Sequence, residues 1–129
     1  MDSESHVRAF CEAFTRRDTK EILGFLAKDA LYHNLPLPPL RGHAAIEPML
    51  QAFLGPCVEA EFELIALASG NGRVLTERID RFVLANGTRI ELPVMGSFEL
   101  GADGLITAWR DYFDLATWTR QMQGGASAS

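Results

Sequence analysis

The chain has 129 residues, of which 47% are hydrophobic and 22% are charged, and its formal net charge is −5 at pH 7. This length fits one compact domain with its own core, and the composition is unlike that of disordered or fibrous chains. An acidic balance without a run of Lys and Arg also argues against a nucleic acid or an anionic membrane as the partner.

The N-terminal segment MDSESHVRAF has neither a basic lead nor a long apolar run. No later window approaches the roughly 18 apolar residues of a membrane span, so we expect a cytoplasmic protein with no membrane partner. The only cysteines are Cys11 and Cys57, which lie in apolar patterns without CxxC spacing. We interpret both as small buried hydrophobic residues rather than as a disulfide or a zinc site.

Three helices are predicted in the first half of the chain. Residues 4–17 carry apolar side chains at i, i+3, i+4 and i+7, which form one face of an amphipathic helix: Val7, Phe10, Cys11 and Phe14. Asp18 is the expected N-cap of a short second helix, with Glu21 three residues later. Apolar spacing from Ile46 to Phe53 predicts a third helix, and Pro48 should make its first turn irregular.

An extended strand end and a loop are predicted over residues 32–42, because three prolines between Pro36 and Pro39 remove backbone donors and exclude a helix. In an extended segment Tyr32 and Asn34 project to one side, and a phenol and an amide there can together fix one water. The alternative is structural, with Asn34 as a turn residue before the prolines and Tyr32 as part of the core.

From residue 57 onward the apolar period changes from 3.6 to 2, which predicts a sheet. Three turn signals, Asn71-Gly72, Asn86-Gly87 and Asp103-Gly104, divide it into strands near 57–68, 73–84, 89–99 and 104–114, joined as an antiparallel meander. The small polar tail at 124–129 is expected to be disordered. Helices followed by a long curved sheet predict an α+β domain that encloses a cup.

Charged residues interrupt the apolar face of two of these strands. Arg78 and Asp80 alternate with apolar residues on one strand, and Asp111 does so on the last. A buried carboxylate needs a partner, and the guanidinium of Arg78 can serve two carboxylates at once. Two acids around one cation cannot easily both stay ionised, so one should hold a proton near neutral pH and form an acid and base pair. The alternatives are a structural salt bridge at the rim of the sheet, or a register that turns one aspartate outward.

Metal and phosphate sites are not expected. His6, His33 and His43 lack ligand spacing, and the glycine-rich positions are turns without a strand-to-helix context.

The segments YHNLPLPPLRG, LTERIDRF, LPVMGSFEL and ITAWRDYFDL, in this order, resemble the limonene-1,2-epoxide hydrolase family. That family lies within the larger NTF2-like group, which includes ketosteroid isomerases and SnoaL-like polyketide cyclases. The resemblance covers residues from about 5 to 120 and implies one domain over 1–123. It implies an NTF2-like cone, in which a strongly curved mixed or antiparallel sheet and about three N-terminal helices enclose an apolar pocket. A homodimer built sheet to sheet and the absence of a cofactor are also implied.

The resemblance implies a role for each polar residue of the set. Asp80 is the general acid that protonates an epoxide oxygen, and Arg78 holds the two acids and helps to place that oxygen. Asp111 is the general base for a water that Tyr32 and Asn34 share. The pocket walls implied are Phe82, Leu92, Val94, Phe113 and Trp118.

The function expected is a cofactor-free epoxide hydrolase that adds water directly to a small apolar, cyclic or terpene-like epoxide and forms a vicinal diol. The short N-terminal lead and the segment LPLPPLRG depart from relatives near the pocket mouth, which leaves substrate size open. The alternatives are an isomerase or cyclase of the ketosteroid isomerase or SnoaL type, and a non-catalytic module that binds a small molecule.

Overall fold

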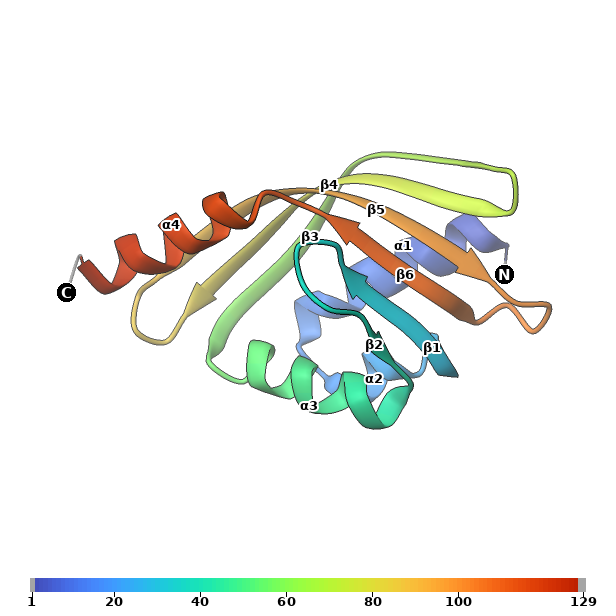
Figure 1. Ribbon diagram of the computed structural model, residues 1–129, viewed down its shortest axis with the longest axis horizontal. Coiled ribbons are helices and arrows are strands. Elements are labelled where there is room, and N and C mark those ends of the chain that lie inside the picture. Colours follow the sequence, from blue (N-terminus) through green and yellow to red (C-terminus); the bar gives the residue numbers. More distant parts are fainter. Residues whose placement is uncertain (1, 128–129) are drawn as a thin grey trace.

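Six strands form one mixed sheet in the spatial order β2-β1-β6-β5-β4-β3 (Figure 1). The computed structural model describes residues 2–127. The strands are β1 (Leu26–Asn34), β2 (Leu40–Arg41), β3 (Cys57–Gly70), β4 (Arg73–Leu84), β5 (Arg89–Leu100) and β6 (Ile106–Tyr112). The helices are α1 (Ser3–Ala13), α2 (Thr19–Leu23), α3 (His43–Leu54) and α4 (Leu115–Ser127). The predicted α+β class is therefore confirmed.

The predicted helices form, with two differences in detail. The first is divided, because α1 passes into a 3-10 turn over Phe14–Arg16 that ends at Arg17, where φ is 54°. Asp18 caps α2 as predicted, since its carboxylate accepts hydrogen bonds from backbone N–H groups of the first turn. The expectation of an irregular first turn in α3 is wrong: the helix begins at His43 and continues through Pro48.

The strand β1 changes the predicted topology. The antiparallel meander is correct for β3 to β6, but β1 pairs in parallel with β6 and makes the sheet mixed. The proline-rich pattern predicted a strand end only from residue 32, whereas β1 begins at Leu26, three residues after the last residue of α2. Because its residues do not alternate cleanly between buried and exposed, periodicity did not reveal this strand.

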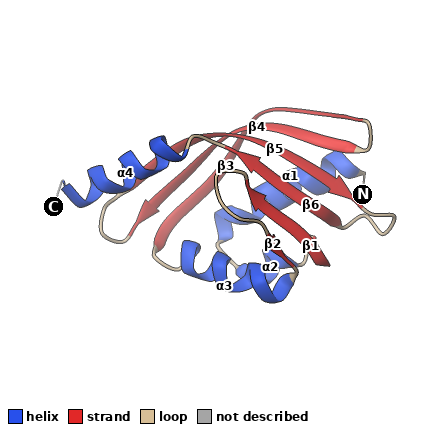
Figure 2. Cartoon of the chain, viewed as in Figure 1, coloured by secondary structure: helices blue, strands red, loops and turns tan. Residues whose placement is uncertain are grey.

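The N-terminal helices pack on one face of the sheet (Figure 2). Phe10 of α1 lies 4.9 Å from Trp109 of β6, and Phe53 of α3 lies 4.6 Å from Phe82 of β4, both measured between ring centroids. These contacts bury the face of the sheet on which the predicted charged residues lie, and leave its other face exposed. The two cysteines are free and buried, as predicted.

The helix α4 follows β6 and was not predicted. It extends to Ser127, beyond residue 123, where the domain was expected to end. The disordered tail expected at 124–129 falls in part on residues 128 and 129, which lie outside the described residues. Among residues 2–127, no helix combines the length and apolar character that crossing a membrane requires.

Candidate active site

A cavity of about 370 Å³ lies between the covered face of the sheet and the helices α3 and α4. Its walls are largely apolar, and they include all five predicted wall residues: Phe82, Leu92, Val94, Phe113 and Trp118. Four polar side chains that were predicted from the sequence also line it: Tyr32, Asn34, Asp80 and Asp111. Leu37 and Leu115 line the cavity and are exposed to solvent, so they mark its mouth.

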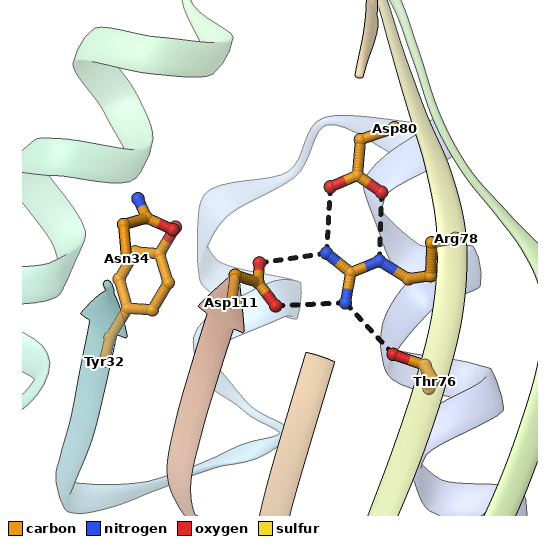
Figure 3. Close-up of polar contacts among 6 residues, drawn as sticks. All are labelled: Tyr32, Asn34, Thr76, Arg78, Asp80 and Asp111. Carbon is orange, nitrogen blue, oxygen red and sulfur yellow. Dashed lines mark hydrogen bonds and ion pairs between the residues drawn. The ribbon is translucent and has the colours of Figure 1, made fainter. Parts of the chain in front are cut away.

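Arg78 joins two strands from beneath this cavity (Figure 3). Its Nε and Nη2 donate to the two oxygens of Asp80 at 2.9 and 2.8 Å, and its Nη1 and Nη2 donate to the two oxygens of Asp111 at 3.1 and 2.9 Å. Nη1 also donates to Thr76 Oγ1 at 3.3 Å. A guanidinium has five N–H donors, and these bonds use all of them.

The cluster is shielded from water. Relative exposure is 0% for Arg78 and 4% for each of Asp80 and Asp111. The ring of Phe62 covers the guanidinium, with the Cζ atom of Arg78 4.5 Å from the ring centroid. Arg78 therefore does not line the cavity, whereas both of its acidic partners do. The five donors of Arg78 are all committed to Asp80, Asp111 and Thr76.

Gly96 makes the reach of Arg78 possible. It lies on β5 between Thr76 of β4 and Asp111 of β6 in the strand register. A Cβ atom at this position would lie 2.5 Å from Arg78 Nη1 and 2.7 Å from Thr76 Oγ1. Gly96 was not among the predicted site residues, although a glycine inside an apolar strand signals a close approach by another group.

Burial and the two carboxylates set the protonation states of the cluster. Burial raises the pKa of Asp80 from 3.8 to about 6, although Arg78 opposes the rise and Asp111 adds to it. Burial would lower the pKa of Arg78, but the carboxylates of Asp111 and Asp80 together raise it well above its ordinary value. With both acids ionised the buried cluster would carry one net negative charge, so one added proton would make it neutral.

Tyr32 and Asn34 stand beside Asp111, on the side away from Arg78 (Figure 3). Parallel pairing of β1 with β6 places Asn34 opposite Asp111. The Tyr32 hydroxyl donates to Asn34 Oδ1 at 2.9 Å, and the Tyr32 ring stacks on Trp109 with centroids 3.8 Å apart. Burial raises the pKa of Tyr32, so the phenol stays neutral. The two side chains share one side of the strand, as predicted.

The thiol of Cys11 is a further titratable group near the cluster. Cys11 of α1 is buried, and burial raises the pKa of its thiol to about 12, so it is not a thiolate near neutral pH. Within residues 2–127 the His, Cys, Asp and Glu side chains form no group of three or more that could hold a metal ion. The polar groups that line the apolar cavity are two carboxyl groups, a phenol and an amide.

Comparison with known proteins identifies the same family that the sequence resembles. The family model for the limonene-1,2-epoxide hydrolase catalytic domain matches residues 2–123. Epoxide hydrolase EphG of Mycobacterium tuberculosis is 33% identical over 109 residues, which are 84% of this chain and 71% of that protein.

Solved structures show the same likeness in three dimensions. A limonene-epoxide-hydrolase-like epoxide hydrolase of M. tuberculosis matches with a TM-score of 0.82 and 29% identity, over 98% of this chain and 92% of that one. A putative polyketide cyclase of Xanthomonas campestris matches with a TM-score of 0.81 and 28% identity, over 92% of this chain and 95% of that one. These neighbours confirm the expected NTF2-like fold.

Proposed function

Because this chain belongs to the limonene-1,2-epoxide hydrolase family and is an epoxide hydrolase of that type, we propose that it adds water in one step to apolar, cyclic or terpene-like epoxides. The products are vicinal diols, and side chains supply the acid and the base without a cofactor. The observation that carries this proposal is one buried guanidinium held between two carboxylates that line an apolar cavity.

Asp80 is the general acid in this proposal. The epoxide oxygen gains negative charge as its bond to carbon breaks, and a proton delivered at that moment stabilises the transition state. A pKa of about 6 keeps a proton available on Asp80 close to neutral pH. Its carboxyl group lines the cavity, where an epoxide oxygen can approach it.

Asp111 is the general base, and Tyr32 and Asn34 hold the attacking water. Because the Tyr32 hydroxyl donates to Asn34 Oδ1, the phenol oxygen remains an acceptor and the amide N–H of Asn34 remains a donor. A water among the three can donate to Asp111 and Tyr32 while it accepts from Asn34. Its remaining lone pair is then directed at an epoxide carbon.

Arg78 acts through the two acids and does not contact the substrate. It aligns both carboxylates, because it donates hydrogen bonds to both oxygens of each. In each turnover the water oxygen forms a bond to carbon as the epoxide C–O bond breaks, Asp111 gains a proton and Asp80 loses one. A proton must pass back to Asp80 before the next turnover.

A single-turnover reaction in heavy-oxygen water tests direct attack. With enzyme in excess, the label should appear in the first diol formed, because the new oxygen comes from water. Unlabelled first diol would mean that a carboxylate had attacked the substrate and formed an ester, which contradicts the proposal.

A second candidate is a cyclase or isomerase, favoured by the 28% identity to a putative polyketide cyclase. Such chemistry removes a proton next to a carbonyl and needs one base and a hydrogen-bond donor to an oxyanion. Here the guanidinium has no donor to spare and two acids flank it. Turnover of an enone or a polyketide ester without incorporation of water would favour this candidate.

We also propose a homodimer built sheet to sheet. The exposed face of the sheet carries Leu75, Met95 and Tyr112, each about half exposed, on the neighbouring strands β4, β5 and β6. Met95 lies directly opposite Tyr112 in the register. Large apolar side chains gathered on one exposed face of a sheet are typical of an interface. Light scattering should give twice the chain mass for the wild type and the single mass for Met95→Glu; a wild-type monomer would contradict the proposal.

A further inference from the structure

The first half of β5 has an open edge on the side of the active site that faces α4. β6 pairs with β5 only from Met95 to Leu100, because the chain leaves the sheet after Tyr112. Residues 89–94 of β5 keep β4 as a neighbour on one side. On the other side their backbone N–H and C=O groups would point away from any strand, and such an edge needs a partner or protection.

Gln121 of α4 supplies that partner with its side chain. Its Oε1 accepts a hydrogen bond from the backbone N–H of Glu91 at 2.6 Å, and its Nε2 donates to the backbone carbonyl of Glu91 at 2.9 Å. The amide thus repeats the two bonds that a paired strand residue would make. Two residues later the same edge presents Pro93, which has no N–H that needs an acceptor.

The helix face that carries Gln121 also forms part of the pocket. Leu115, Trp118 and Met122 are spaced at i, i+3 and i+7, so they lie on one side of α4 together with Gln121. Leu115 and Trp118 line the cavity. Trp118 stacks on Phe53 of α3, with ring centroids 5.5 Å apart, so it closes the space between the two helices. The position of this wall therefore depends on how α4 is held against β5.

We propose that Gln121 is a positioning residue for substrate binding: its paired hydrogen bonds to Glu91 fix α4 at the open edge of β5 and hold Trp118 as a wall of the pocket. This inference rests on the proposed function, since the wall matters only if the cavity binds the substrate. A terminal amide is the side-chain group that offers one donor and one acceptor side by side, and the shorter Asn would lack one methylene of reach.

The test compares Gln121→Met, which keeps the length and loses both bonds, with Arg120→Met on the exposed side of the same helix. Amide hydrogen exchange at Glu91 reports directly on the two hydrogen bonds between Gln121 and Glu91. Gln121→Met should accelerate this exchange about tenfold, as expected for the loss of two ordinary hydrogen bonds. KM for cyclohexene oxide should rise about tenfold with kcat within about twofold, because a wall contact acts equally on substrate and transition state. Arg120→Met should change neither.

Binding of hexanamide, a neutral apolar amide, gives a readout that does not depend on turnover. Its dissociation constant, measured by calorimetry, should rise in Gln121→Met in parallel with KM. If the wild type binds hexanamide and hydrolyses no epoxide, the proposed function fails, while the exchange rate and the dissociation constant still decide the role of Gln121. An unchanged exchange rate at Glu91 in Gln121→Met would show that the two hydrogen bonds do not fix α4. Faster exchange with an unchanged KM and an unchanged dissociation constant would show that Gln121 has no role in binding.

Discussion

The protonation of Asp80 predicts how the activity depends on pH. As the proposed general acid, Asp80 must carry a proton when the substrate binds, and burial raises its pKa to about 6. The protonated fraction is then about one half at pH 6, about one tenth at pH 7 and about one hundredth at pH 8. We therefore expect kcat/KM to fall about fifty-fold between pH 6 and pH 8, with a slope that approaches tenfold per unit.

The raised pKa of Asp80 also has a consequence for stability. The pKa in the folded protein lies above its ordinary value of 3.8, so the folded state binds this proton more tightly than the unfolded state does. The stabilisation that results is complete below pH 3.8 and is lost as the pH rises through 6. It amounts to about 3 kcal/mol, because proton affinity differs about a hundredfold between the two states and each factor of ten is worth about 1.4 kcal/mol.

The variant Asp80→Asn tests both the effect of this proton on stability and its effect on activity. Unfolding by denaturant at pH 4 and at pH 7 should show that the advantage of the wild type over this variant shrinks by about 2 kcal/mol between the two, because pH 4 lies just above the ordinary pKa of 3.8. The variant should lose most activity, because the amide keeps the shape but has no acidic proton to give. Asp29→Asn is the matched control, since Asp29 is exposed on β1. A wild-type kcat/KM that stays level from pH 6 to pH 8 would refute the assignment of Asp80 as the acid.

Three further substitutions test the geometry of the cluster. Gly96→Ala should lower kcat/KM at least a hundredfold and the unfolding free energy by about 1–3 kcal/mol, because the new methyl group overlaps Arg78 Nη1; Gly70→Ala, where a Cβ atom meets nothing within 4 Å, should leave the activity intact. Arg78→Lys should cost about 3–5 kcal/mol of stability and most of kcat, since an ammonium cannot bind both carboxylates in the same geometry; wild-type kcat in this variant would show that the fork is not needed. Tyr32→Phe should lower kcat about ten- to a hundredfold with little change in KM, because it removes an acceptor for the attacking water, and a change in KM alone would indicate that Tyr32 serves only as a wall.

The sequence contained enough information to predict the charged cluster, because buried charges are conspicuous in an apolar pattern. Arg78, Asp80 and Asp111 were singled out on that ground, and the structure places them in contact. The walls were less accessible to this reasoning. Trp118 came only from the resemblance to a family, since α4, the helix that carries it, was not predicted from the sequence.

The features that were not predicted from the sequence depend on backbone hydrogen bonds or on the absence of a side chain. Gly96 matters because it leaves space, and β1 matters because it pairs in parallel with a strand far away in the sequence. Gln121 binds the backbone of Glu91, so no pairing of side-chain types announces the contact. Local periodicity carries no information on such contacts, which depend on the final arrangement of the strands.

The cavity has a consequence for the protein as a whole, because a domain of 129 residues leaves about 370 Å³ of its interior unfilled by its own side chains. Phe14, Leu50 and Phe62 belong both to the hydrophobic core and to the cavity wall. An apolar ligand therefore completes the core when it binds, and at a hundred times its dissociation constant it should stabilise the fold by about 2.7 kcal/mol. A rise in melting temperature can therefore be used to search for the natural epoxide. Stable carbocycles of increasing size, tested in the same way, would show how large a ligand the cavity accepts.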